Sequence, residues 1–145
     1  MATEYNLALA IGAGLSLLAS LMHVGVIMVG PSWYRLFGAG EGFVRAAQAG
    51  RWFPAVVTAG IALVLAAWAA YGLSGAGLIA PLPLLGPALC AITLVYLLRG
   101  MLGPFALAGT GRSSRFIWVS SAICLVYGLV HLVGVVQVWG TFTQP

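Results

Sequence analysis

Four long apolar runs constrain the fold of this chain more than any other feature of its sequence. An α-helix needs about 20 mainly apolar residues to cross the hydrocarbon core of a bilayer. We therefore predict an all-α membrane protein, a single four-transmembrane-helix bundle with spans at about residues 7–29, 54–73, 84–102 and 116–138. Only 6% of the residues are charged, against about 25% in soluble domains. The expected solvent of this chain is therefore lipid.

The cationic residues predict how the bundle is oriented. All six are arginines, and they lie in two connections: Arg35, Arg45, Arg51, Arg99, Arg112 and Arg115. The remaining connection, residues 74–83, contains none. Because cytoplasmic connections are enriched in Lys and Arg, both arginine-bearing connections are expected inside and both termini outside, an N-out/C-out topology. The arginines flank apolar helices and form no groove-reading motif, so nucleic acid is not an expected partner.

Proline and serine residues indicate several helix ends. Pro54 suits the first turn of the second span, where its missing N–H breaks no helical hydrogen bond. Ser113 or Ser114 is expected to cap the fourth span. The prolines within residues 81–87 predict an irregular start of the third span, which is expected to end near Leu102.

The first arginine-bearing connection is long enough to contain a helix of its own. Glu41 and Arg45 have the i,i+4 spacing of an ion pair on a helix. We predict a short interfacial helix from Gly40 to Gln48 with these two side chains paired.

A faint internal repeat is also visible. Gly-Pro pairs stand at residues 30–31 and 103–104, near the ends of the first and third spans. The pattern suggests two parallel helical hairpins related by an axis along the membrane normal. Chance matching in a chain rich in glycine and alanine is the alternative.

Polar residues recur along single faces of three spans. One face of the fourth span carries Ser120, Cys124, Tyr127 and His131. One face of the first span carries Ser16, Ser20 and His23, and one face of the third span carries Thr93, Tyr96 and Gly100. An unpaired polar group facing hydrocarbon is costly, so these faces are expected to meet in a polar seam inside the bundle. The seam has two interpretations, helix packing or a ligand cavity.

Polar groups are expected to be densest in the inner half of the bundle, beneath the arginines. Arginine can hold phosphate or carboxylate in bidentate fashion, and a histidine near hydroxyl groups can move a proton. An anionic lipid or hydrophobic amphiphile is therefore the expected ligand, and arginines that only meet headgroups are the alternative. The candidate ligand-binding residues are His23, Thr93, Tyr96, Arg99, Ser120, Tyr127, His131, Arg35 and Glu41.

No cofactor or metal is expected. His23 and His131 lie at different predicted depths, so they do not suit the two axial positions of one haem. No acidic residue or CxxC motif lies in a span to complete a zinc or iron site. Cys90 and Cys124 share a predicted depth and are interpreted as small packing residues.

Two stretches carry a resemblance to known sequences. They run from His23-Val24-Gly25 through Gly30-Pro31 to Glu41, and from Ser120 to His131. Both resemble small, uncharacterised bacterial four-span membrane proteins. The resemblance implies a bacterial inner membrane and a single bundle, and it implies no activity.

Three classes of function are compatible with the sequence. The first is a protein that binds or transports a hydrophobic amphiphile or lipid. The second is an accessory subunit of a larger membrane complex, and the third is a small membrane enzyme that uses a histidine as acid or base. Small-residue faces also favour a homodimer or another membrane-protein partner.

Overall fold

The computed structural model describes residues 5–143, and all of their regular structure is helical. The elements are α1 (Leu7–Val29), α2 (Pro31–Leu36), α3 (Glu41–Gln48), α4 (Phe53–Gly75), α5 (Leu85–Ala106) and α6 (Ser114–Thr143). Helices α1, α4, α5 and α6 are each long and apolar enough to cross a membrane. The prediction of an all-α chain with four helices long and apolar enough to span a membrane is thus confirmed.

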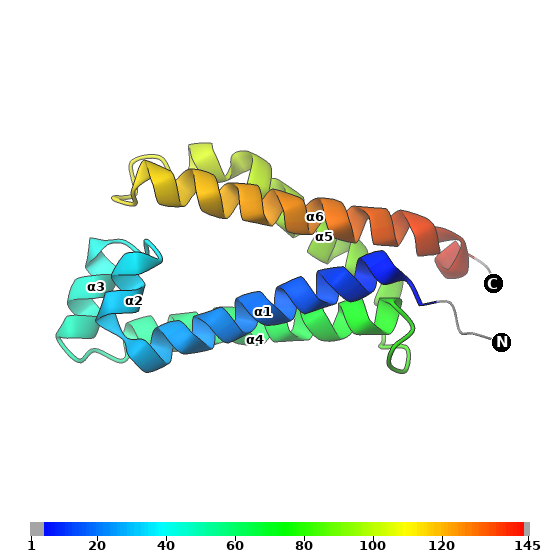
Figure 1. Cartoon of the computed structure of the whole chain (residues 1–145), viewed down its shortest axis with the longest axis horizontal. Coiled ribbons are helices and arrows are strands. Elements are labelled where there is room, and N and C mark those ends of the chain that lie inside the picture. The colour runs from blue at the N-terminus through cyan, green and yellow to red at the C-terminus, as the bar shows by residue number, and fades with distance from the viewer. Residues whose placement is uncertain (1–4, 144–145) are drawn as a thin grey trace.

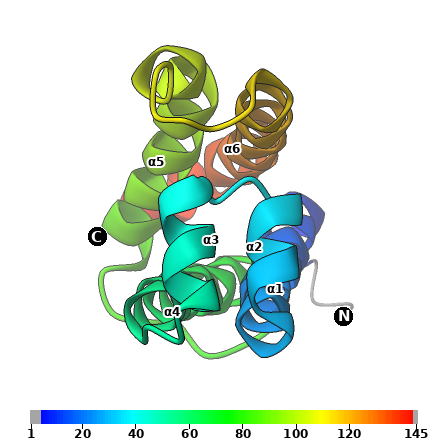
Figure 2. The ribbon, with the colours of Figure 1, turned by 90° about the vertical axis from the view of Figure 1, so that its left-hand side faces the viewer.

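The four long helices form two closely packed pairs, α1 with α4 and α5 with α6 (Figure 1). The pairs lie close together where α1 begins and α6 ends, and they diverge toward the other end of the bundle (Figure 1). Helices α2 and α3 lie at that other end, across the long axis, together with the α5–α6 connection (Figures 1 and 2). We call it the arginine end, because these segments carry Arg35, Arg45 and Arg112, with Arg51 just before α4 and Arg115 in the first turn of α6.

Glycines allow α5 and α6 to approach each other closely. A Cβ atom added at Gly100 would lie 2.7 Å from the backbone nitrogen of Leu125. In the reciprocal contact, a Cβ atom added at Gly128 would lie 2.9 Å from the backbone nitrogen of Leu97. Small residues at such contacts are typical of helix pairs in membranes, where dispersion forces between close backbones stabilise association.

The junction between the two pairs uses the same device. A Cβ atom added at Gly12 of α1 would lie 2.8 Å from Cε1 of His131 in α6. One added at Gly134 of α6 would lie 2.5 Å from Cγ of Leu9 in α1. Leu9 is fully buried and packs with Leu89 and neighbouring apolar residues. A large side chain of α6 therefore packs against a glycine of α1, and a large side chain of α1 packs against a glycine of α6.

Hydrogen bonds tie the chain together at the end opposite the arginines. Asn6 caps α1, because its Oδ1 accepts from the backbone N–H of Leu9 at 2.8 Å. Its Nδ2 donates to Oε1 of Gln137 at 2.9 Å, and its backbone N–H donates to the carbonyl of Ala76 at 3.1 Å. The residues around the start of α1, the end of α4 and the end of α6 therefore lie side by side.

Two of the predicted helix-end signals are confirmed. Pro54 lies in the first turn of α4. The Oγ of Ser113 accepts from the backbone N–H of Phe116 at 3.2 Å, so this serine caps α6. The predicted end of the third span at Leu102 is wrong, since α5 continues through Pro104. That proline lies in the last turn, where its missing N–H removes only one bond before the helix ends.

The predicted interfacial helix is present as α3, but the prediction missed α2 before it. Gly30 ends α1 with a positive φ of 83°, which permits the sharp change of direction into α2. The hydroxyl of Tyr34 in α2 donates to Oγ1 of Thr58 in α4 at 3.1 Å, and Val44 of α3 packs against this tyrosine. Both short helices are therefore fixed to the first pair.

The two Gly-Pro pairs of the suggested repeat have different structures. Gly30 is the break between two helices, whereas Gly103 is a buried, helical residue inside α5. A side chain on Gly103 would collide with Arg99 and Ser121. Helix α5 therefore continues through its Gly-Pro pair, whereas α1 ends at the corresponding pair.

Candidate functional site

A buried polar seam runs through the centre of the bundle, as the stripes of polar residues predict. Its members are buried residues of α1, α5 and α6: Ser16, Ser20, Thr93, Tyr96, Ser121 and His131. The hydroxyl of Tyr96 and Oγ of Ser16 are 2.9 Å apart and hydrogen-bonded across two helices. The Oγ of Ser20 donates to the carbonyl of Ala62 at 2.7 Å. These bonds satisfy groups that would be costly to leave unpaired in lipid.

Tyr96 is the centre of an aromatic cluster within this seam. Its ring centroid lies 4.9 Å from that of Trp68, 5.5 Å from that of Tyr127 and 5.3 Å from that of His131. The rings of Trp68 and Tyr127 both meet it edge-on, the arrangement that aromatic quadrupoles favour. One residue of α5 thereby contacts side chains from α1, α4 and α6.

His131 is fully buried at the junction of the two pairs. Its Nδ1 lies 2.8 Å from the carbonyl oxygen of Tyr127 one turn earlier. A carbonyl can only accept, so Nδ1 carries the proton of the neutral ring and Nε2 holds a lone pair. Within residues 5–143, no donor reaches that Nε2. The imidazole packs against Gly12 and leaves no space beside it on α1.

His23 and Thr93 do not join this cluster by direct contacts. Nδ1 of the half-buried His23 lies 2.7 Å from the carbonyl oxygen of Ala19, and Oγ1 of Thr93 donates to the carbonyl of Leu89 at 2.7 Å. Both side chains thus bond to their own helices. His23 was expected to share a ligand site with Thr93 and Tyr96, but the α1 residue that contacts Tyr96 is Ser16, two turns earlier.

Arg99 is held between α5 and α6, inside the membrane-spanning part of the bundle. Its Nη1 donates to Oγ of Ser121 and its Nη2 donates to Oγ of Ser120, both at 3.1 Å. The guanidinium lies over Gly103, where a side chain would collide with Nη1. Ser120 also donates to the carbonyl of Ile117 at 3.2 Å, which fixes its hydroxyl hydrogen.

A second group of charged residues lines a hollow at the arginine end. This arginine hollow has a volume of about 240 Å³. Its lining residues are Arg35, Gly38, Gly40, Glu41, Val44, Gly111, Arg112 and Ser113. They come from the α2–α3 segment of the first pair and from the α5–α6 connection of the second. The hollow therefore lies between residues of the two pairs, at the end where the pairs diverge.

The predicted ion pair of Glu41 is absent from the described part of the chain. Glu41 lies in the first turn of α3 and Arg45 in the last, and both are exposed. No arginine nitrogen among residues 5–143 lies within salt-bridge distance of the carboxylate. The prediction is wrong because exposed side chains gain little from pairing and lose rotamer freedom.

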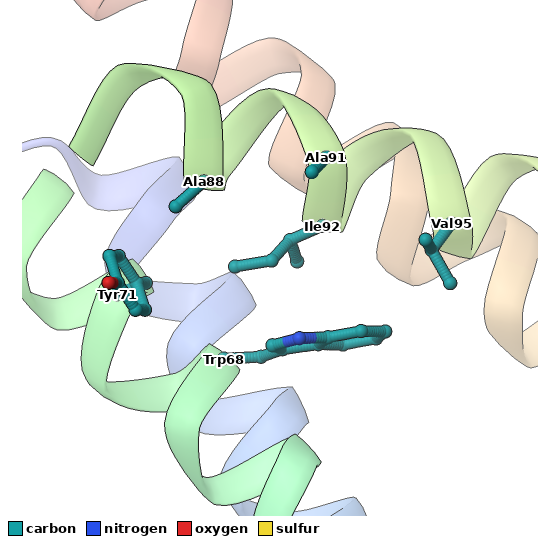
Figure 3. Close-up of a pocket in the computed structure, with 6 residues that line it drawn as sticks. All are labelled: Trp68, Tyr71, Ala88, Ala91, Ile92 and Val95. Carbon is teal, nitrogen blue, oxygen red and sulfur yellow. The ribbon is translucent and has the colours of Figure 1, made fainter. Parts of the chain in front are cut away.

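A third feature is an apolar groove between α4 and α5, also of about 240 Å³. Its lining residues are Trp68, Tyr71, Ala88, Ala91, Ile92 and Val95 (Figure 3). The flat indole of Trp68 lies along one side, opposite Ile92 and Val95 (Figure 3). The groove offers dispersion contacts to an apolar chain. Its polar side-chain groups are the indole N–H of Trp68 and the hydroxyl of Tyr71, which donates to the carbonyl of Pro83 at 3.2 Å.

The cysteines pack in separate places. Cys90 contacts the cluster around Leu9 and Leu89, whereas Cys124 contacts the cluster around Tyr96. Both thiols are free and half-buried. Among the described residues there is no group of three or more His, Cys, Asp or Glu side chains that could hold a metal.

Three contributors to these sites were missed by sequence reasoning. Trp68 stands in an alanine-rich span without a polar periodicity, Ser121 is one residue away from the stripe, and Arg112 was read only as an orientation signal. The close pairing of α5 with α6 is what brings Ser121 to Arg99.

Comparison of the chain with protein-family models, curated proteins and solved structures finds no match.

Proposed function

We propose that this chain is a bacterial inner-membrane protein that binds the anionic headgroup of a lipid or other amphiphile at its arginine end. One observation carries the proposal: Arg35 and Arg112, from different helix pairs, line the same hollow. Two guanidinium groups concentrate positive charge there against the single carboxylate of Glu41. Arginine is well suited to phosphate or carboxylate, because its planar fork can donate two parallel hydrogen bonds.

The size of the hollow favours a headgroup over a whole molecule. Pockets for drug-sized ligands enclose roughly 300 to 1,000 Å³, whereas the arginine hollow encloses about 240 Å³. A phosphate or carboxylate fits this space, and the apolar part of the amphiphile would remain in the surrounding bilayer.

Binding is better supported than transport. The seam above the hollow is closed by direct packing, with His131 against Gly12 and Tyr96 against Trp68. An amphiphile at the arginine end would therefore hold the two helix pairs together at the place where they diverge. With the arginine-bearing connections on the cytoplasmic side, the ligand comes from the inner leaflet, whose anionic lipids attract arginine.

Lipid analysis of purified variants tests the proposal. Arg35→Gln and Arg112→Gln each remove one guanidinium from the hollow and should reduce copurified anionic lipid, measured by mass spectrometry of extracts. Arg51→Gln is the matched control, because Arg51 is exposed and does not line the hollow. Equal lipid content in all three variants and the parent protein would contradict the proposal.

A further inference from the structure

Arg99 was expected in the connection between the third and fourth spans, but the structure places it within α5. It stands seven residues before the end of α5, and its partner Ser121 stands seven residues after the start of α6. At 1.5 Å per residue, both helices place the guanidinium about 10 Å inside the arginine end. A cation at such a depth is costly, and in membrane proteins it usually faces the protein interior and a functional partner.

The chain supplies no described counter-ion for this charge. Its only acidic residues are Glu4 and Glu41. Glu41 lies at the surface of the arginine end, in no ion pair within residues 5–143, and Glu4 falls outside those residues. The partners of Arg99 in the structure are two neutral hydroxyl groups.

The guanidinium nevertheless has donors to spare. It carries five N–H bonds, of which one on Nη1 and one on Nη2 go to Ser121 and Ser120. No acceptor in the described part of the chain takes the other three. The two serines bind the two terminal nitrogens of the guanidinium and hold its plane fixed over Gly103. An arginine that served only for orientation would extend toward the headgroups and would need no such clamp.

We propose that Arg99 binds a phosphate group between α5 and α6, supplied by the headgroup of an anionic phospholipid drawn toward this position. The remaining N–H bonds of the guanidinium donate to two phosphate oxygens, and Ser120 and Ser121 position the fork. The site is independent of the arginine hollow, since Arg35 and Arg112 take no part in it. A phosphate here neutralises the arginine that lies farthest inside the spans, seven residues from the end of α5, whereas Arg115 lies in the first turn of α6.

Native mass spectrometry of the full chain in detergent, titrated with dioleoylphosphatidic acid, tests the proposal. Arg99→Gln should weaken binding about tenfold or more, as expected for the loss of a charge-assisted pair of hydrogen bonds. Arg99→Lys keeps the charge but cannot donate two parallel bonds, so it should also bind more weakly. Arg45→Gln is the control, because this arginine is exposed on α3, and its binding should equal that of the parent protein.

The outcomes separate the alternatives. Unchanged binding by Arg99→Gln overturns the site, and unchanged binding by Arg99→Lys shows that charge alone suffices and overturns the fork geometry. If Arg99→Gln does not fold, the lysine variant decides by the same criterion. In a parallel titration, inorganic phosphate at the lipid concentration should not displace the lipid. Displacement would overturn phospholipid as the source of the phosphate.

Discussion

Gly12→Ala should destabilise the bundle at the junction between its two helix pairs. The added Cβ would lie 2.8 Å from Cε1, 3.0 Å from Nδ1 and 3.1 Å from Nε2 of His131. The imidazole cannot retreat freely, because its Nδ1 is bonded to the carbonyl of Tyr127 and its other face packs against the ring of Tyr96. Either the ring shifts and loses these contacts, or α1 moves away from α6.

The size of the effect follows from overpacking. Inserting a methyl group into a close-packed core typically costs about 1 to 3 kcal/mol. Replacing glycine by alanine also favours the helix by up to about 1 kcal/mol, which acts in the opposite direction. Gly14→Ala measures that second contribution alone, since a Cβ at Gly14 meets nothing within 4 Å. The difference between the two variants should therefore be about 1 to 3 kcal/mol.

Unfolding by SDS in mixed detergent micelles, followed by tryptophan fluorescence, provides the measurement. The steric explanation can be isolated in a His131→Ala background, which removes the ring that the new methyl group meets. There, Gly12→Ala and Gly14→Ala should differ by less than about 0.5 kcal/mol. Equal stability of the two variants in the parent protein, or an undiminished difference without the imidazole, would refute the reasoning.

Three further predictions address the seam, the surface and the topology. Ser16→Ala and Tyr96→Phe, combined in a double-mutant cycle by SDS unfolding, should show a coupling of about 0.6 to 1.7 kcal/mol, and strict additivity would contradict their hydrogen bond. Glu41→Gln should change stability by no more than about 0.5 kcal/mol in the same assay, because the carboxylate has no described ionic partner; a larger loss would reveal one. In a variant without native cysteines, a new thiol at Ala80 should react with an impermeant reagent outside intact cells, whereas one at Ala108 should react only after permeabilisation. The opposite pattern would reverse the proposed orientation.

The sequence alone determined the spans and which of their polar side chains are buried between the helices. Apolar length predicted four membrane helices, and the first of them, residues 7–29, matches α1 at both ends. The polar stripes correctly indicated that Ser16, Ser20, Tyr96 and His131 are buried, because a span without other polar groups must turn them away from lipid. These are local or one-dimensional properties, and they can be read from periodicity and composition.

The tertiary structure decided which buried groups meet. Periodicity assigns a face to a helix, but it contains no information on the partner or on the axial shift between two helices. The axial shift between two helices depends on which large side chains pack against glycines of the neighbouring helix. Leu97 packs against Gly128 in this way, and His131 packs against Gly12. This axial shift places Tyr96 beside Ser16 rather than His23. In lipid, helix pairs are stabilised by close backbone approach at small residues, and a similar pattern of polar side chains on two helices does not determine which residues meet.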